Sequence, residues 1–393
     1  MHIALVTETY APDVNGVALT VQSLLTELRA AGHRVTLVRT RHPGEAATAP
    51  DELRIASLPI PRYPGLRFGL PAGGHLRRAF AAAAVDAVYV ATEGPLGYSA
   101  VGAARMLGVP VATGFHTRFD DYVRHYGARW LAPVALAWMR HFHARASCTL
   151  VPTQELQRWL QTRSFARVEL LRRAVDTQLF HPRRRDPVLR AELGLGAADP
   201  LVLAVGRIAA EKNLELLVEA FARVRAQAPG ARLVWVGAGP ARAALEARRL
   251  PGQQFVGVQQ GEALARWYAS ADLFLYPSLS ETFGNVTLEA MASGVPVLAF
   301  DYAAAHEHIV DGHNGWLAPF GDHPAFLRQA ERATGEWVAG ARPGIAGRAA
   351  VEALSPAQVA ADLCALLRRE QQHLRQIEEQ RRRHDAAVHS TIL

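Results

Sequence analysis

Residues 273–294 read LFLYPSLSETFGNVTLEAMASG, and this stretch decides the fold. The apolar run Leu273–Pro277 is typical of a buried strand. Residues 290–293 continue a helical pattern that Gly294 can end. A strand that runs through a turn into a helix predicts a β-α unit, whose turn lies at the carboxyl edge of an open parallel sheet, where ligands bind.

The turn itself predicts an anion site. The first N–H groups of a helix have no acceptor within the helix, and the helix dipole adds positive potential, so the amides of 282–286 suit a phosphate. Glu281 in the turn and Glu289 about two turns into the helix can accept hydrogen bonds from sugar and ribose hydroxyls on either side. A plain strand, loop and helix with a capping acid and a surface acid is the alternative. The donor-binding candidates of this stretch are Glu281, Phe283, Gly284, Asn285, Val286 and Glu289.

A second turn of the same kind follows the strand expected at 200–205. It reads GRIAAEKN over residues 206–213, and a helix is expected from about Leu214. Arg207 and Lys212 both leave this turn, and two cations there can neutralise a diphosphate and the charge that develops as it departs. Lys212 is the one lysine of the chain beside 42 arginines. Its presence suggests a site that needs a compact ammonium, although chance retention is the alternative.

The following strand, 232–236, ends in the turn Gly237-Ala238-Gly239-Pro240. This is not a dinucleotide fingerprint, because Arg242 stands where the third glycine would be. A nicotinamide cofactor is therefore not expected. Gly237 and Val258, which follows the short strand expected near 254–258, are further donor-binding candidates.

The N-terminal half opens with a β-α-β pattern. A strand at 3–6, a loop at 7–16, a helix at 17–31 and a strand at 35–38 follow one another. Gly16 can let the backbone approach a ligand closely at the helix start. A simple glycine at the helix entry is the alternative.

Two further strands are expected to end at polar residues. Glu93 follows the strand at 85–91, and His116 follows the strand at 109–113. The acceptor-binding candidates are the polar residues of these turns and of the first loop: Tyr10, Asp13, Asn15, Glu93, His116, Thr117 and Arg118. Residues 118–145 mix Tyr, Trp, His and Arg with apolar residues at near-helical spacing. They predict either an amphipathic helix that contacts a membrane or an acceptor, or a helix with an ordinary core-facing side.

The motifs at 206–213 and 278–296 resemble the nucleotide-binding segments of the retaining glycosyltransferases of family 4. The resemblance implies an α/β protein of GT-B fold, with two Rossmann-like β/α/β domains facing across a cleft and a C-terminal helix that returns to the first domain. The expected domains are an acceptor-binding domain (1–183), a nucleotide-sugar-binding domain (184–370) and a charged helical tail (371–393). Residues 183–187 are expected to be a linker. The resemblance also implies diphosphate binding by Arg207 and Lys212, sugar contact by His116, and a mainly architectural role for residues 307–315.

The expected activity is transfer of a hexose, with mannose from GDP-mannose favoured by resemblance, to a hydroxyl of a lipid or glycan acceptor. The catalytic candidates are His116, Arg207, Lys212 and Glu281. Arg207, Lys212 and the 283–286 amides can stabilise the departing diphosphate, so no metal is expected. Three alternatives stay open: a UDP-sugar-dependent glucosyl or glycolipid synthase with a diacylglycerol acceptor, a non-catalytic nucleotide-sugar-binding protein, and a GT-B-fold epimerase.

Composition limits the class of protein. The 393 residues, half of them apolar, suit two folded domains. Two cysteines give no disulfide framework, no leader pattern precedes the first strand, and no uninterrupted apolar run reaches ~18 residues. The net charge of +7 is uneven: residues 1–185 carry 23 basic and 13 acidic side chains, and the rest 20 and 23. We expect a cytoplasmic protein whose basic half meets an anionic substrate or the inner face of the cytoplasmic membrane, and no nucleic-acid partner.

Overall fold

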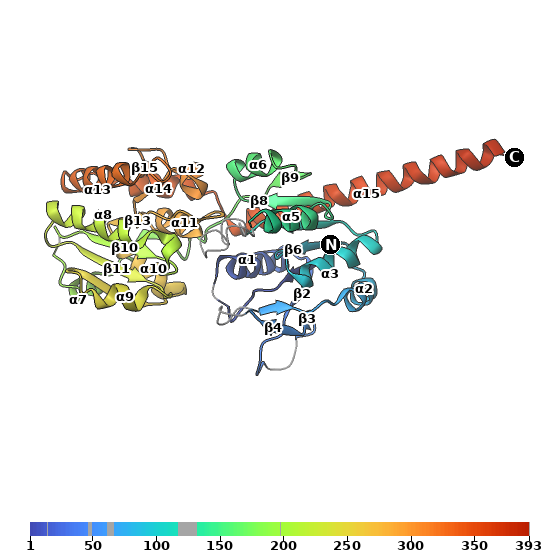
Figure 1. Ribbon diagram of the computed structural model, residues 1–393, viewed down its shortest axis with the longest axis horizontal. Coiled ribbons are helices and arrows are strands. Elements are labelled where there is room, and N and C mark those ends of the chain that lie inside the picture. The colour runs from blue at the N-terminus through green and yellow to red at the C-terminus, as the bar shows by residue number, and fades with distance from the viewer. Residues whose placement is uncertain (14, 46–48, 61–66, 117–131, 197, 393) are drawn as a thin grey trace. The chain divides into compact units, whose positions relative to one another are not determined.

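The computed structural model describes residues 1–13, 15–45, 49–60, 67–116, 132–196 and 198–392 (Figure 1). Contacts divide the chain into two compact units. Among the described residues, the N-terminal unit comprises 1–116, 132–172 and 356–392, and the C-terminal unit comprises 173–355. The sequence-based domains place their limits at 183 and 370 instead, and they remain a prediction.

The N-terminal unit is built on a parallel sheet with the strand order β3-β2-β1-β6-β7-β8-β9. A short antiparallel pair, β4-β5, accompanies it. The strands are β1 (His2–Thr7), β2 (Arg34–Thr40), β3 (Glu52–Ile55), β4 (Ser57–Pro59), β5 (Arg67–Gly69), β6 (Ala87–Val90), β7 (Val111–Gly114), β8 (Cys148–Val151) and β9 (Val168–Leu170). The helices are α1 (Gly16–Ala30), α2 (Gly73–Ala82), α3 (Pro95–Met106), α5 (Ala132–His143), α6 (Gln154–Gln161) and α15 (Pro356–Ile392).

The C-terminal unit is built on a second parallel sheet, in the order β12-β11-β10-β13-β14-β15. Its strands are β10 (Leu201–Val205), β11 (Arg232–Val236), β12 (Gln253–Gly257), β13 (Leu273–Tyr276), β14 (Val297–Phe300) and β15 (Trp316–Ala318). Its helices are α7 (Pro187–Glu192), α8 (Leu214–Gln227), α9 (Arg242–Ala247), α10 (Gly261–Ser270), α11 (Asn285–Ala292), α12 (Ala303–His308), α13 (His323–Val338) and α14 (Gly344–Val351), with 3₁₀ turns η2 (Pro182–Arg184) and η3 (Ala210–Lys212).

Both sheets are covered on both faces, which explains their continuous apolar strands. In β10, Val202 and Ala204 pack into one buried cluster, whereas Leu201 and Leu203 pack into another. Alternate side chains of a strand point to opposite faces, so each face of the sheet has a core of its own. The α/β fold with two Rossmann-like sheets is confirmed.

Polar side chains cap the starts of two helices in the N-terminal unit. The Asn15 side chain accepts hydrogen bonds from the N–H groups of Val17 and Ala18 and so begins α1. Thr153 accepts a hydrogen bond from Leu156 N–H at 3.1 Å and begins α6. These caps satisfy amide groups that the helix leaves without acceptors.

One expectation about the connection between the units is wrong. Residues 183–187 are not a free linker, because Arg185 donates to Asp272 at 2.8 Å and Asp186 caps α7. Arg190, which is buried, donates to the same Asp272 carboxylate at 2.6 Å. The charge and proline content of the stretch predict a linker. In the structure, Arg185 and Arg190 both donate to the Asp272 carboxylate, just before β13.

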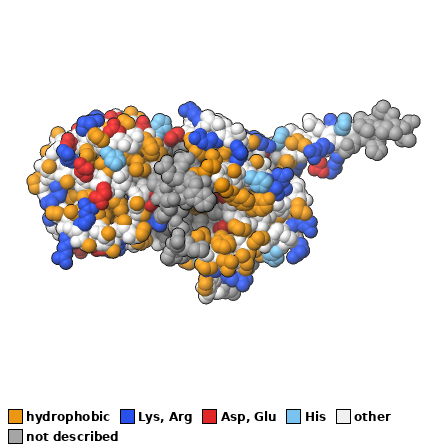
Figure 2. Space-filling model, viewed as in Figure 1, with side chains coloured by type: hydrophobic (Ala, Val, Ile, Leu, Met, Phe, Trp, Pro, Cys, Tyr) orange, Lys and Arg blue, Asp and Glu red, His pale blue; other side chains and the backbone are white. Residues whose placement is uncertain are grey.

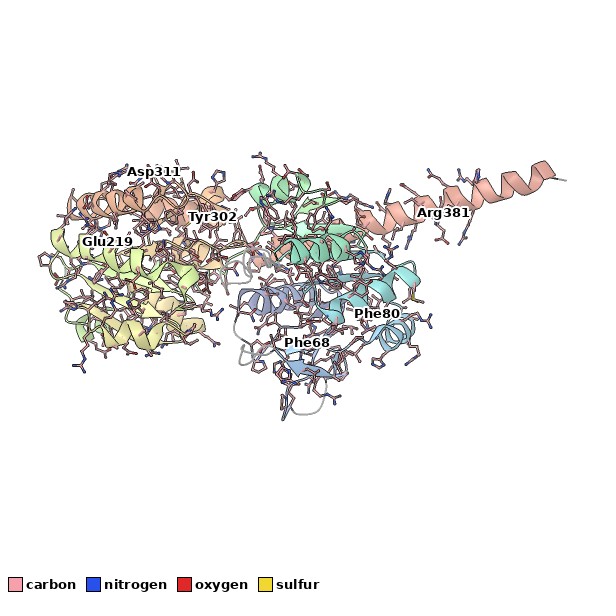
Figure 3. All side chains as sticks on the ribbon, in the orientation of Figure 1. Phe68, Phe80, Glu219, Tyr302, Asp311 and Arg381 are labelled. Carbon is pink, nitrogen blue, oxygen red and sulfur yellow. The ribbon has the colours of Figure 1, made fainter. Side chains whose placement is uncertain are left out.

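Helix α15 belongs to the N-terminal unit, where it packs against α1. Its first turns bury Leu363 and Leu367, and Arg167 pairs with the buried Glu370. The C-terminal helix therefore returns to the first unit, as expected. Farther along the helix the side chains are mostly exposed; Arg381 is an example (Figure 3).

One part of the described chain has the length and composition of a membrane-crossing helix. It is Gly344–His384, whose most apolar window has a mean hydropathy of 1.3. The stretch comprises α14 and most of α15, which are separate helices. A single candidate of this kind is weak support for a membrane span.

Candidate donor site

Two turns at the carboxyl edge of the C-terminal sheet bring Lys212 and Glu281 together. The Lys212 Nζ forms an ion pair with Glu281 Oε1 and lies 3.4 Å from Ser278 Oγ. Lys212 is at the end of η3 beyond β10, and Glu281 follows β13. Because β10 and β13 are neighbours in the sheet, residues that are 69 positions apart in the chain meet at one point.

Arg207 stands at the beginning of the same turn. Its guanidinium lies 3.7 Å from Glu211 Oε1, and its side chain is 40% exposed. The Glu211 carbonyl accepts a hydrogen bond from Leu279 N–H, which joins the β10 turn to the β13 turn. Residues of both turns line a small pocket, among them Gly206, Arg207, Lys212, Tyr276 and Pro277. Two cations thus occupy one wall of a sheet-edge pocket, which suits a diphosphate.

The start of α11 completes this edge. Gly284 precedes the helix with φ of 91°, a left-handed conformation that glycine adopts without strain. Asn285 and Val286 form the first helical turn, whose N–H groups have no acceptor within the helix. Phe283 is buried, and its carbonyl accepts from Ala304 N–H. The turn therefore carries the amide groups and the positive helix end that the sequence predicts.

Glu289 lies about one turn into α11 and is half-buried. Its Oε2 accepts a hydrogen bond from the Tyr268 hydroxyl at 2.9 Å. Desolvation raises the pKa of Glu289 from 4.5 to about 7, and the Tyr268 hydrogen bond acts in the opposite direction. Burial first, and then the charge of Glu289, hold the pKa of the Tyr268 phenol well above its usual range.

The glycines after β11 serve close backbone packing. A Cβ at Gly237 would lie 1.9 Å from the Gly206 carbonyl oxygen, and one at Gly239 would lie 2.2 Å from that of Ile208. Gly237 therefore seats the β11 turn directly against the β10 turn that carries Arg207. Val258, next to the end of β12, is 54% exposed.

In the N-terminal unit, His116 is hydrogen-bonded to Tyr89. Its Nε2 lies 2.7 Å from the hydroxyl of the buried Tyr89, and the two rings meet edge to face. A Cβ at Gly114 would lie 2.3 Å from His116 Nε2 and 2.5 Å from the Tyr89 hydroxyl, so a larger residue there would require this pair to move. Sequence reasoning missed Tyr89, which reads as an ordinary residue of a buried strand.

Glu93 is buried beside His143, a residue that the sequence did not single out. His143 Nε2 faces Glu93 Oε1 at 3.5 Å, and His143 Nδ1 lies 2.8 Å from Thr113 Oγ1. The Trp138 indole donates to the Glu93 backbone carbonyl at 3.1 Å. Glu93 thus contacts α5 rather than an open surface.

The first loop of the chain is internally bonded. Asn15 caps α1 and also donates to Thr9 Oγ1 at 2.6 Å, and that hydroxyl donates to Asp13 at 3.1 Å. Tyr10 lies under the Arg39 guanidinium at 6.0 Å. Gly16 is exposed in the first turn of α1. The acceptor candidates Thr117 and Arg118 lie outside the described residues.

Glu8 is a second glutamate that the sequence did not single out. It follows β1, is buried, and its Oε1 accepts from Leu96 N–H at 2.7 Å in the first turn of α3. A Cβ at Gly94 would lie 2.0 Å from Glu8 Oε2. Burial raises the pKa of Glu8 from 4.5 to about 7, against the hydrogen bonds from backbone amides.

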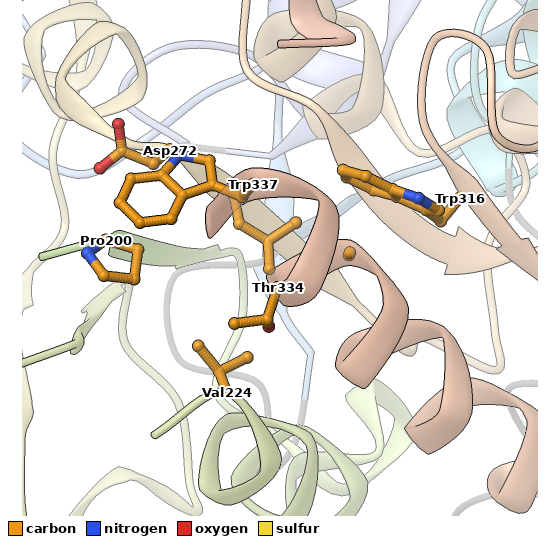
Figure 4. A pocket seen from close by; sticks show the side chains of 8 residues that line it. Pro200, Val224, Asp272, Trp316, Thr334 and Trp337 are labelled. Atoms are coloured by element: carbon orange, nitrogen blue, oxygen red, sulfur yellow. The ribbon is translucent and has the colours of Figure 1, made fainter. Parts of the chain in front are cut away.

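A different pocket lies at the opposite, amino edge of the C-terminal sheet (Figure 4). Its walls are mostly apolar, with Pro200, Leu273, Trp316 and Trp337 among them, and they also include Asp272. None of the eight described residues that line this pocket is a Lys or Arg that could balance a diphosphate, so we place the candidate site at the carboxyl edge. On the face in view, acidic and basic side chains are interspersed over the C-terminal unit (Figure 2). The described residues contain no group of three or more His, Cys, Asp or Glu that could hold a metal ion.

Comparison with known proteins identifies the family. Residues 199–335 match a family model described as glycosyl transferases group 1, and residues 14–179 match one described as glycosyltransferase family 4. The chain is 35% identical to a GDP-mannose-dependent alpha-mannosyltransferase of Mycobacterium tuberculosis, over 82% of this chain and 85% of that protein. It is 30% identical to an alpha-monoglucosyldiacylglycerol synthase of Streptococcus pneumoniae, over 82% and 76% of the two chains.

Solved structures agree on the fold. Sucrose-phosphate synthase from Thermosynechococcus elongatus superposes with a TM-score of 0.74 at 24% identity, covering 94% of this chain and 98% of that one. The neighbours of this kind are glycosyltransferases of GT-B fold. The expected resemblance is confirmed, and the chain belongs to glycosyltransferase family 4 and is a hexose-transferring glycosyltransferase of GT-B fold.

Proposed function

We propose that the protein transfers mannose from GDP-mannose to a hydroxyl of a lipid or glycan acceptor, with retention of the anomeric configuration. The observation that carries the donor half is that Arg207 and Lys212 line one pocket, while Lys212 pairs with Glu281 in the turn before α11. The preference for mannose rests on the mannosyltransferase relative. Retention rests on the family resemblance.

In this proposal each group of the C-terminal edge acts on one part of the donor. Arg207, Lys212 and the first amides of α11 bind the diphosphate and stabilise the charge it gains when the bond to the sugar breaks. Glu281 accepts hydrogen bonds from sugar hydroxyls, and Glu289 accepts them from the ribose. Phe283 and Gly284 shape the turn, and Gly237 and Val258 lie toward the nucleoside.

The acceptor half is assigned to the N-terminal unit. The acceptor oxygen forms the new bond to the anomeric carbon and loses its proton, while the diphosphate leaves with the electron pair of the broken bond. His116, held by Tyr89, is the residue we propose to contact reacting groups from this unit. Cations at the diphosphate supply the charge stabilisation for which other enzymes use a metal, so we propose metal-independent transfer.

We further propose a cytoplasmic enzyme that works at an anionic membrane surface. Helix α5 exposes Val134 and Trp138, 63% and 43% respectively, while Arg140 and His141 lie at its C-terminal end. Apolar and aromatic side chains next to cations suit a membrane interface. Figure 2 shows hydrophobic side chains over the N-terminal unit on the face in view.

Donor choice is tested by thermal unfolding with GDP, UDP, GDP-mannose and UDP-glucose at equal concentration. A ligand that binds the folded state raises the melting midpoint by mass action. We expect GDP and GDP-mannose to raise it and the uridine compounds to have a much smaller effect. A uridine-selective shift would favour the second candidate, a UDP-sugar-dependent glycolipid synthase, which the synthase relative supports.

Membrane contact is tested with liposomes that contain phosphatidylglycerol. Replacing Val134 and Trp138 by Ser should weaken sedimentation with these liposomes about tenfold, because both side chains are exposed and apolar. Replacing the exposed Val188 and Val338 of the C-terminal unit by Ser is the matched control. Equal binding by both double variants and wild type would argue for an acceptor in solution.

A further inference from the structure

We propose that Tyr276 is a positioning residue that holds Glu281 for the sugar when Lys212 turns to the diphosphate. The inference rests on the proposed function and adds to it a residue whose hydroxyl carries no role there. Tyr276 is the last residue of β13, five positions before Glu281.

Three donors meet on one oxygen of Glu281. The Lys212 ammonium, the Tyr276 hydroxyl and the Ser278 hydroxyl all contact Oε1, with Ser278 Oγ at 2.7 Å. Among the described residues no donor contacts Oε2 of the same carboxylate. The carboxylate is therefore anchored by one oxygen and can present the other to a ligand hydroxyl.

Lys212 cannot be the lasting anchor if it also binds phosphate. Its ammonium has three donors on a flexible stem, so a diphosphate beside Arg207 competes with Glu281 for it. Tyr276 and Ser278 are neutral, and neither is drawn toward a phosphate charge. Once the nucleotide-sugar is bound, these two hydroxyls are the groups that keep Glu281 in place.

The tyrosine is built to remain a hydrogen-bond donor. Burial first, and then the charge of Glu281, hold the pKa of Tyr276 well above its usual range. Its ring stacks on Phe274 at 5.5 Å and lies under the Gly284 turn, where a Cβ would be 3.5 Å from it. The Lys212 Nζ is 5.7 Å from the ring centroid. The strand and the turn thus fix the ring, and the fixed ring sets the position of the hydroxyl.

The test uses Tyr276→Phe, which keeps the ring and removes the hydroxyl. We expect the affinity for GDP, which has no sugar, to stay within twofold of wild type. The affinity for GDP-mannose, or kcat at saturating donor, should fall roughly 10- to 100-fold, the range for a hydrogen bond to a charged group. If wild type selects uridine nucleotides, UDP and UDP-glucose serve as the pair.

Tyr268→Phe is the matched control. It removes the corresponding hydroxyl from Glu289, the proposed ribose ligand, so GDP and GDP-mannose should lose affinity equally. Ser278→Ala should reproduce the Tyr276→Phe pattern in weaker form. The melting midpoint without ligand verifies that each variant is folded.

Two failures are distinguishable. If Tyr276→Phe weakens the binding of GDP and GDP-mannose to the same degree, Tyr276 is not a positioning residue for the sugar. The same conclusion follows if the substitution changes neither the affinity for GDP-mannose nor kcat. If wild type binds none of the four nucleotide compounds, the proposed function is overturned, and the assignment of Tyr276 is overturned with it.

Discussion

The carboxyl edges of the two sheets carry similar residues, but these differ in burial and in their hydrogen-bond partners. Each edge has a glutamate whose pKa burial raises to about 7, Glu8 in the N-terminal unit and Glu289 in the C-terminal unit. Glu8 accepts hydrogen bonds from backbone amides of its own unit, whereas Glu289 has one side-chain partner, Tyr268. The first glutamate is a cap for α3, and the second is half-buried and able to accept from a ligand.

The same contrast extends to the cations and histidines. On the C-terminal edge, Arg207 and Lys212 pair with acids yet keep 40% and 21% of their side chains exposed. On the N-terminal edge, Glu93 and His143 face each other with almost no exposure. Burial with internal partners indicates structure, and partial exposure with exchangeable partners indicates binding.

The largest expected effect on catalysis concerns Lys212. Lys212→Arg keeps the charge but puts a planar fork where one ammonium contacts Glu281 Oε1 and Ser278. We expect kcat/KM to fall about 100-fold, the scale for loss of one preorganised donor to a developing charge. Steady-state kinetics with the preferred donor measures it. Arg248→Lys, at an exposed ion pair with Glu215, is the control, and near-full activity of Lys212→Arg would remove the argument for a compact ammonium.

The turns that carry Lys212 and Glu281 show what the sequence can and cannot predict. The strand-turn-helix patterns at 206–213 and 273–294 predict both turns at a sheet edge, since periodicity and turn chemistry are local properties. They do not predict that Tyr276 and Ser278 share Oε1 of Glu281, which depends on side-chain directions at the end of β13. The charges of Arg207 and Lys212 at a sheet-edge turn suggested their roles, and the family resemblance agreed, but neither gave a signal for the hydroxyls.

Distant pairs were missed for a different reason. Glu8 meets Leu96 N–H, 88 positions away, and His143 meets Thr113, 30 positions away. A lone glutamate after a strand looks like any polar turn residue until the order β1-β6-β7 is known. The signal that could have pointed to Glu8 is Gly94, because a glycine before a helix start leaves room for a cap from another element.

A second prediction concerns stability, because the raised pKa of Glu8 makes folding depend on pH. For Glu8, the folded-state pKa of about 7 lies above the unfolded value near 4.5. The stability it contributes is fully present below pH 4.5 and is lost as pH rises through 7, a total of about 3 kcal/mol. Glu8→Gln keeps an acceptor for Leu96 N–H and removes this titration, so its melting midpoint should vary less between pH 5 and 8.

Glu8→Ala tests the cap directly. Without the carboxylate, Leu96 N–H lies buried without its acceptor, which should destabilise the N-terminal unit by about 1–3 kcal/mol at pH 5. The shift that GDP gives in the melting midpoint should persist in both variants. Loss of the GDP shift in Glu8→Gln would mean that the two edges are not as different as their contacts indicate.

The smallest effect is the pH dependence of donor binding. Ribose hydroxyls donate to the ionised form of Glu289, so binding must displace a proton at any pH below its pKa of about 7. GDP-mannose has no phosphate that titrates near neutral pH, so its affinity should rise about tenfold from pH 6 to pH 8 through Glu289 alone. Calorimetry at several pH values measures this rise, and Glu289→Gln should flatten it while Glu8→Gln leaves it unchanged. If Glu8→Gln flattened it instead, the proton released on binding would come from the N-terminal edge, and the assignment of Glu289 to the ribose would be wrong.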